Sequence, residues 1–318
     1  MARDRPPVGP LARGRHGWPR GLRASPIRIA PTPVRAYTVW VDSQLRHDFA
    51  AAIAGPDIDV DLFSAALIVA RLSGAVPDSV ACGVTLDGLG EAAAFHAGHG
   101  AGTEVLAQAI DHQLFTVLRF RGNADKYDDP RNSFLDSVIE RRVGIPITLS
   151  LVYMEIARRI GLRCDGIGYP GHFIVRCGDP EDGIFVDPFH QGARLDRNEL
   201  LANLQGMNLG TTSPPSFLSA ITRRQILQRM LNNLRNIYQK SRDLERWYAT
   251  VDLLLCIEPW NSALTGERGM LAFRLGDSAS ALTDLERYVA STTPETGSTG
   301  ARRLLDQLRL QLGIEGRL

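Results

Sequence analysis

The hydrophobic pattern of the first third of the chain predicts helices. From Val39 to about Arg119, apolar residues recur at spacings of three and four positions. The segments SQLRHDFAAAIAG and DVDLFSAALIVARLSG each end at glycine, as many helices do, and TEVLAQAIDHQLFTVLRF has the pattern of another amphipathic helix. The turn-rich stretch NADKYDDPRN follows, and we expect SFLDSVIERRVG after it to be a short helix that ends at Gly144.

The pattern then changes in a way that predicts an α+β domain. The segment IPITLSLVYMEIARRIGL (145–162) is apolar on nearly every face, which is typical of a helix in the centre of a domain, and Pro146 suits the first helical turn. Three short β-type runs follow, CDGIGY, HFIVRC and GIFVD, separated by the turn sequences YPG and GDPEDG. A helical front half, one central helix and a small antiparallel sheet make up the expected fold.

Beyond TTSPPS (211–216) the pattern is helical again and contains an internal repeat. Asp243 and Asp277 lie 34 residues apart, and Pro259 and Pro294 lie 35 apart. A helix–turn–helix period of 34 residues with proline at the end of the unit is typical of tetratricopeptide repeats, although other helical hairpins produce similar spacings. We therefore predict an all-α tetratricopeptide-like domain over 217–318, with ARRLLDQLRLQLG as its capping helix. The α+β domain is assigned to 37–210.

Charge is balanced over the whole chain but not along it. Eight arginines and one acid lie in residues 1–35, which leaves 28 basic against 34 acidic residues in the remainder. An acidic body gives no electrostatic reason to bind nucleic acid. The Arg/Pro-rich segment 1–36 has no apolar periodicity, so we expect a disordered tail, or a start site placed too far upstream.

Targeting and redox signals are absent from the sequence pattern. The tail lacks the apolar region of a signal peptide, and its prolines oppose the amphipathic helix of a transit peptide. No uncharged apolar run is long enough to span a bilayer. The four cysteines are scattered without a CxxC motif, so neither a disulfide framework nor a zinc site is indicated. We expect a cytoplasmic protein without membrane contact, metal or other cofactor.

His172 and Asp187 are the candidate chemical pair. They lie on the two strands of a predicted hairpin, and side chains directly opposite one another share a face. A register in which paired residue numbers have an odd sum, such as Cys177 opposite Ile184, puts both on one side, and an even sum separates them. The odd register also gathers Phe173, Val175 and Val186 on the other face, which favours it. Asp187 would then orient His172, as in nucleophile–His–Asp sites.

The run NSFLDSVIERRVGIPITLSLVYMEIARRIGL…GIGYPGHFIVR…FVDPFHQG resembles the transglutaminase-like domain of the SirB type, which often precedes tetratricopeptide repeats. The resemblance covers about residues 40–300. It implies a papain-like α+β core in which a Cys begins the central helix, a His lies on the next strand and an Asp on the one after. His172 and Asp187 match the last two positions.

The first position of that triad does not match, because the place of the nucleophile falls at Pro146. A helix N-terminus stabilises a thiolate, but proline has no nucleophile and lacks the backbone N–H. Thr148 and Ser150 lie near enough in sequence to be weak substitute nucleophiles, although such residues more often cap or line a helix. Cys164 is expected to be a small core residue, and Cys177 faces the wrong side of the hairpin in the odd register.

Several other residues are candidates for binding roles. His190 follows Asp187 closely and is either a second polar group of the site or a loop residue. The resemblance makes the block around Tyr127, Asn132 and Arg142 a wall of the cleft, while Asn132 is equally explained as a helix N-cap.

Two weaker motifs have simpler explanations. The spacing of His96 and His99 suits a metal, but no thiol or carboxylate cluster accompanies it. GHGAG lacks the Lys-Ser/Thr of a phosphate loop, so we interpret it as a linker.

Two functional hypotheses follow from the sequence. The first is a non-catalytic transglutaminase-like protein that binds or regulates protein or peptide partners through its repeats. The second is a hydrolase or acyl transferase acting on peptide or protein amides, with His172, Asp187 and a non-standard nucleophile. Proline at the nucleophile position favours the first. The pattern carries no information on oligomeric state.

Overall fold

The computed structural model describes residues 43–207, 214–292 and 299–314. The expected tail at 1–36 and the first half of the TTSPPS joint lie outside these residues. The chain forms two compact units, one of residues 39–264 and one that includes residues 265–318. The fold is α+β, as predicted: helices predominate and one small sheet is antiparallel.

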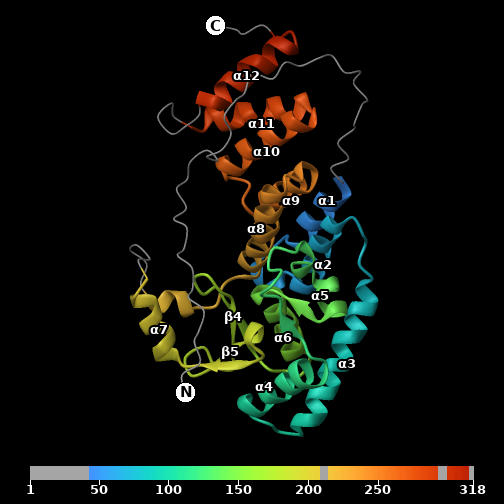
Figure 1. The fold of residues 1–318 in the computed structure, drawn as a ribbon, viewed down its shortest axis with the longest axis vertical. Coiled ribbons are helices and arrows are strands. Elements are labelled where there is room, and N and C mark those ends of the chain that lie inside the picture. Colours follow the sequence, from blue (N-terminus) through green and yellow to red (C-terminus); the bar gives the residue numbers. More distant parts are fainter. Residues whose placement is uncertain (1–42, 208–213, 293–298, 315–318) are drawn as a thin grey trace. The chain divides into compact units, whose positions relative to one another are not determined.

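The front half of the larger unit is helical, as the periodicity predicts (Figure 1). Aspartates cap two of its helices: Asp61 accepts the Ser64 N–H at 3.1 Å, and Asp78 accepts the Ala81 N–H at 2.9 Å. The helices are α1 (Ser43–Ala52), α2 (Leu62–Ala70), α3 (Ser79–Ala97), α4 (Thr103–Asp111) and α5 (Leu135–Arg141).

The end of α5 differs from the prediction. The helix ends at Arg141 and does not extend to Gly144, because its C-cap Arg142 adopts the left-handed conformation with φ 60°. Gly144 instead lies in a short strand, β2 (Val143–Gly144), which pairs in parallel with β1 (Arg121–Gly122). We expected Gly144 to end the helix, but the glycine serves another purpose: close side-chain neighbours in the core leave no room for a Cβ at this position.

The central helix α6 (Pro146–Arg159) is buried along most of its length, as predicted. It contacts α3, α4 and α5 from the helical half and β3 and β4 from the sheet. Tyr153 is fully buried in the middle of the helix and donates its hydroxyl to the Ala107 carbonyl at 3.1 Å. This hydrogen bond ties the middle of α6 to α4.

The sheet consists of four antiparallel strands in the order in which they occur along the chain. Val175 pairs with Val186 and Cys177 with Ile184, which is the odd-sum register. The last strand was not predicted, because its three residues are largely exposed and show no apolar alternation. The strands are β3 (Cys164–Ile167), β4 (Ile174–Cys177), β5 (Ile184–Asp187) and β6 (Ala193–Leu195).

Helix α7 (Arg197–Gln205) follows the sheet. Leu200 and Leu204 of α7 lie in one hydrophobic cluster with Ile167, Ile174 and Phe185 of the sheet. The helix therefore covers one side of the β-layer.

Two helices of the predicted repeat region, α8 (Arg223–Ser241) and α9 (Leu244–Ile257), belong to the larger unit. Helix α9 contacts α1, where Arg46 pairs with the buried Asp252 at 2.6 Å, and α8 contacts α2 and α6. The compact units thus divide after Leu264. The division of the chain at 211–216, which follows the sequence repeat, stays a prediction about repeat boundaries.

The helical hairpins that follow have the repeat geometry expected from the sequence. Asp277 caps α11 (Ser278–Ala290) by accepting the Ser280 N–H, just as Asp243 caps α9 by accepting the Arg246 N–H. Within the smaller unit, Arg268 and the buried Asp284 form an ion pair at 2.6 Å. The remaining helices are α10 (Ser262–Leu275) and α12 (Thr299–Gln311), and α12 contacts α11.

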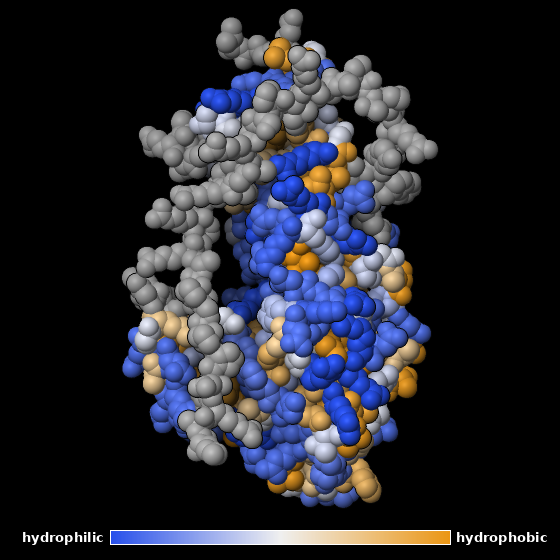
Figure 2. All heavy atoms as spheres, viewed as in Figure 1, coloured by the Kyte–Doolittle hydropathy of each residue, from blue (hydrophilic) through white to orange (hydrophobic). Residues whose placement is uncertain are grey.

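On the face seen in Figure 2, hydrophilic residues cover most of the described surface, and hydrophobic residues are scattered among them. Among the residues that the structure describes, no helix has the length and apolar character needed to cross a bilayer.

Gly122, in β1, lies close to the Phe189 ring, and a substitution at Gly122 tests this contact. A Cβ at Gly122 would lie 2.5 Å from the Phe189 ring, so we expect Gly122→Ala to push that ring away and to reduce the free energy of unfolding by about 1–3 kcal/mol. Gly88→Ala is the matched control: this exposed position in α3 has open space around it, and alanine should stabilise the helix by up to about 1 kcal/mol. Urea denaturation of both variants measures the difference, and equal stability would contradict the role of Phe189.

Candidate functional site

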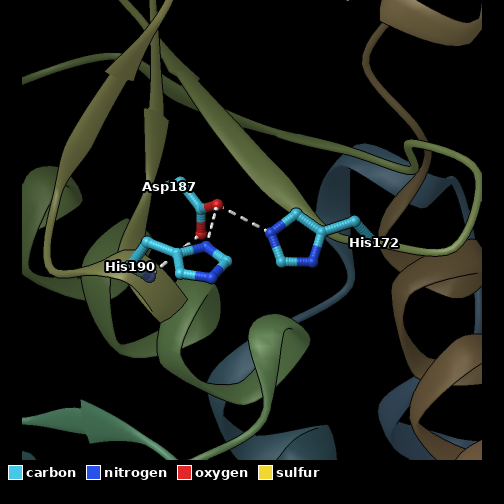
Figure 3. A group of neighbouring side chains, drawn as sticks. All are labelled: His172, Asp187 and His190. Atoms are coloured by element: carbon cyan, nitrogen blue, oxygen red, sulfur yellow. Dashed lines mark hydrogen bonds and ion pairs between the residues drawn. The ribbon is translucent and has the colours of Figure 1, made fainter. Parts of the chain in front are cut away.

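His172 and Asp187 lie side by side at one end of the sheet (Figure 3). The YPG sequence forms a turn in which the His172 N–H donates to the Tyr169 carbonyl at 3.0 Å and Gly171 has φ 72°. This turn delivers His172 just before β4, and Asp187 ends β5. His172 Nε2 lies 2.8 Å from Asp187 Oδ2. The hypothesis that the two residues share a face is in agreement with this geometry.

The Asp187 carboxylate also organises the turn that follows it. Its Oδ1 accepts the N–H groups of Phe189 at 3.0 Å and His190 at 3.3 Å, which caps the 3-10 turn η5 (Pro188–His190). The sequence DPFH favours this arrangement, because proline suits the first position of a turn and aspartate accepts from the N–H groups beyond it.

Asp187 is ionised in this setting. Burial by itself raises the pKa of the Asp187 carboxyl, but hydrogen bonds and charge from His172 and His190 outweigh burial and hold the pKa below its usual range. Because an ionised carboxylate only accepts, His172 carries a proton on Nε2. Its Nδ1 makes no hydrogen bond to any part of the chain that the structure describes, and it points away from Asp187 (Figure 3).

His190 joins the pair. Its Nδ1 lies 2.7 Å from Asp187 Oδ2, and its side chain is 65% exposed. Of the two alternatives that the sequence left open, the structure supports a second polar group of the site. The His172 and His190 rings lie 5.7 Å apart, and the Phe189 ring lies edge-on to both of them.

The donor atoms of His172, Asp187 and His190 all lie within 4.8 Å of one another, and within the described ranges they are the one group of three or more such ligands. A tetrahedral zinc ion, with ligands at about 2.0–2.1 Å, keeps its ligand atoms roughly 3.4 Å apart. Both nitrogens would therefore have to move away from Oδ2, because the spacing in the structure is that of hydrogen bonds. The expected absence of a metal stays a prediction.

His96, whose spacing to His99 would suit a metal, stacks its ring on that of His112, with centroids 4.5 Å apart.

A small cavity of about 180 Å³ lies beside His172. Pro146, at the start of α6, lines it together with Tyr127 and His172. The position at which the family resemblance places a nucleophile thus borders the same space as the imidazole, and a proline occupies it. A larger cavity of about 570 Å³, lined by residues of η1 (Asp57–Asp59), α6 and β3, shares no residue with this site.

The two hydroxyl candidates are both fully buried and do not line the cavity. Thr148 Oγ1 donates to the Asn132 carbonyl at 2.7 Å and accepts the Ile145 N–H at 3.2 Å, so it acts as a cap of α6. Ser150 Oγ has no hydrogen-bond partner among the described residues and is closed off from solvent. Neither hydroxyl meets His172 in this structure.

The cysteines are also separate from the site. Cys164 begins β3 and its Sγ lies 3.4 Å from that of Cys177, to which it is paired across the sheet. Burial, followed by the neighbouring Cys177 thiol, raises the pKa of Cys164 well above its ordinary value. Neither these two residues nor Cys82 and Cys256 line the cavity beside His172.

The predicted binding residues have different positions. Tyr127 lines the cavity, and burial raises the pKa of its hydroxyl. Asn132 is fully buried and does not line the cavity; its amide donates to the Lys126 carbonyl at 2.8 Å. It is not the N-cap of α5 either, because Phe134 occupies that position. Arg142 is exposed and donates to the Leu118 carbonyl at 3.3 Å. A binding role for Asn132, Arg142 and His190 stays a prediction.

Sequence reasoning missed two residues of the cavity wall, Arg229 and Asn233, which lie on α8. They are four positions apart on an amphipathic helix, and they border its buried stripe, to which Leu227 and Met230 belong. The sequence does show this polar pair at the edge of the apolar stripe, but nothing in the sequence indicates that this edge faces His172.

Comparison with known proteins agrees with the architecture. Residues 83–232 match the family model of the transglutaminase-like superfamily, and residues 234–313 match a tetratricopeptide repeat model. The chain therefore carries a transglutaminase-like domain followed by tetratricopeptide repeats, as the sequence predicted. The finer SirB-type assignment stays a prediction.

Relatives with this similarity occur in bacteria and animals. A UPF0162 protein of Xylella fastidiosa (strain Temecula1) is 39% identical over 187 residues, which cover 57% of this chain and 66% of that protein. Human F-box only protein 21 is 30% identical over 185 residues, which cover 53% of this chain and 28% of that protein. The match thus spans a little under two thirds of the bacterial relative. No solved structure matches the chain.

Because the pKa of Asp187 is lowered in the folded protein, we predict that the free energy of unfolding falls at acidic pH. A carboxyl whose pKa is lower in the folded than in the unfolded state stabilises the fold fully above the unfolded value, near 3.8, and this contribution is lost as pH falls through the folded value. We expect Asp187→Asn to lose about 1–3 kcal/mol at pH 7 and the gap to wild type to narrow below about pH 4.

The measurement is urea denaturation of both proteins between pH 3 and 7. Glu181→Gln, at an exposed position of the hairpin loop, controls for the loss of one acidic charge. A gap that stays constant across this range would show that the carboxylate charge of Asp187 does not stabilise the fold.

Proposed function

We propose that this protein is a non-catalytic transglutaminase-like module that binds protein or peptide partners. One observation carries the proposal: Pro146 occupies the start of α6, and it lines the same cavity as His172. Covalent acyl transfer needs a nucleophile within hydrogen-bond reach of its base. Proline supplies no such atom, and the buried Thr148 and Ser150 hydroxyls lie outside the cavity.

The repeats support the binding part of the proposal. Tetratricopeptide helices stack into surfaces that bind peptides or helices, and here they follow the transglutaminase-like domain directly. The first hairpin, α8 and α9, packs within the same compact unit as the His172 site. The cytoplasmic location and the lack of a cofactor stay predictions.

The second candidate is amide hydrolysis or acyl transfer. It is supported by the short His172–Asp187 contact of 2.8 Å, which leaves Nδ1 of His172 free to act as a base. This candidate requires a serine, threonine or cysteine side chain that reaches Nδ1, and among the described residues none of these three types lines the cavity. The two candidates differ in whether any side chain reacts with an acyl probe.

We expect wild-type protein to show no His172-dependent labelling by fluorophosphonate or vinyl sulfone probes. Pro146→Cys should acquire such labelling, because a thiol at the start of α6 would lie at a helix N-terminus beside the imidazole, and both lower its pKa. The measurement is the rate of labelling followed by mass spectrometry of the intact protein.

The double variant Pro146→Cys, His172→Ala is the control, and its labelling should fall by at least about tenfold. Wild-type labelling that disappears in His172→Ala would establish the enzymatic candidate instead. If the thiol introduced by Pro146→Cys were no more reactive than the native cysteines, the cleft would not be preserved.

The binding proposal predicts that the smaller unit contributes to partner capture. A chain ending at Asn261 keeps α8 and α9, which pack on α1 and α2, and removes α10 to α12. We expect partners purified with the full chain to be lost from this shortened chain while its thermal unfolding transition remains. Equal recovery of partners from both chains would show that α10 to α12 do not take part.

A further inference from the structure

The cavity beside His172 has the size of one functional group. Its volume of about 180 Å³ is below the roughly 300–1,000 Å³ typical of sites for whole small-molecule ligands. Since one water takes up about 30 Å³ of liquid, the space suits a side chain or a chain end rather than a cofactor.

Arg229 makes the cavity wall positive. It is half-buried and donates to the carbonyl oxygens of His172 at 2.8 Å, Gly168 at 3.3 Å and Tyr169 at 3.5 Å. These bonds leave at least two of the five guanidinium N–H groups available. Burial lowers the pKa of Arg229, and within the described ranges no carboxylate forms an ion pair with it. A half-buried guanidinium without a counter-charge favours an anion from outside.

Other groups around the cavity are also suited to an anion. Ile147 lies in the first turn of α6, a helix of 14 residues whose first N–H groups have no intrahelical acceptor. The Asn233 amide and the Tyr127 hydroxyl offer neutral donors.

Among the described residues, no acidic side chain lines the cavity. The carboxylate of Asp187 is occupied on both oxygens, since Oδ1 accepts two backbone N–H groups and Oδ2 faces both imidazoles. It makes no ion pair with Arg229.

We propose that this cavity, which His172 borders, binds one carboxylate group of a peptide partner, with the Arg229 guanidinium as its counter-ion and the start of α6 and Asn233 as further contacts. A single guanidinium matches a monoanion, whereas a phosphate dianion would bring a second charge that the wall does not compensate. The inference rests on the proposed function, because it names the ligand class of the same site.

The test is a titration of the full chain, labelled with 13C in the histidine rings, followed by NMR. The probes are N-acetylalanine, which has a chain-end carboxylate, N-acetylaspartate amide, which has a side-chain carboxylate, the neutral N-acetylalanine amide, and inorganic phosphate. The His172 resonance, assigned with His172→Gln, should shift saturably with at least one carboxylate probe and not with the neutral amide. The tighter of the two carboxylates identifies the source.

Arg229→Met should weaken carboxylate binding by at least about tenfold. Because Arg229 also holds the loop that carries His172, Asn233→Leu serves as a second variant. Asn233 makes no hydrogen bond to any residue that the structure describes, so this variant should keep the fold, and we expect its affinity for the carboxylate probe to fall roughly threefold. Lys240→Met removes the same charge from an exposed position on α8 and should leave affinity unchanged.

Several results would overturn the inference: equal shifts with the acid and the amide, tighter binding of phosphate, or unchanged affinity in both Arg229→Met and Asn233→Leu. Its failure is distinct from that of the proposed function. Cleavage or acylation by the wild-type protein refutes the non-catalytic assignment even if carboxylates bind, and a chain that neither reacts nor binds them refutes this inference alone.

Discussion

The site depends on one buried carboxylate. Asp187 ends β5, caps the turn after it through Oδ1, and holds two imidazoles through Oδ2. Because these contacts use different oxygens, one side chain sets both the backbone path beyond the strand and the orientation of His172. A buried charge is tolerated only when its hydrogen bonds are satisfied, and those of Asp187 are. The Asp187 carboxylate thus fixes the geometry at this end of the sheet, and its own hydrogen bonds are all made.

The start of α6 borders the cavity beside the imidazole. In a thiol-dependent site, a helix N-terminus stabilises the developing thiolate, but Pro146 removes the thiol and keeps the helix. The positive end of the helix, the imidazole and the guanidinium of Arg229 then surround a space to which the described residues contribute no anion. The same electrostatics that would activate a nucleophile is available for binding a ligand carboxylate.

Helix α8 links the repeats to this site. It spans the boundary between the two matched regions, since the transglutaminase-like match ends at 232 and the repeat match begins at 234, and it packs on α2 and α6 and directs Arg229 to the carbonyl groups of the loop that carries His172. The residues that shape the cavity therefore come from both the central helix α6 and the helix α8 that leads into the repeats. A partner held by the repeats would be tethered to the unit that contains the cavity, which raises its effective concentration there.

The sequence alone determined the elements that local periodicity and turn chemistry specify. The buried character of 145–162, the odd-sum hairpin register and the 34-residue repeat were all readable, because each depends on residues close in the chain or on a strict period. His172 and Asp187 followed from that register, and Pro146 followed from the family resemblance. The end of α5 and strand β6 were not readable, since Arg142 adopts a left-handed conformation and β6 has almost no apolar pattern.

Only the tertiary structure decided which distant side chains meet. Asn132 is drawn into the core by the hydrogen bonds of a folded loop, and Thr148 is committed to a cap by a carbonyl 16 residues earlier. Arg229 reaches His172 from 57 positions away because α8 packs on the central helix rather than on the later repeats alone. Periodicity shows that a helix has a buried face, but the partner of that face is fixed by packing among segments far apart in sequence.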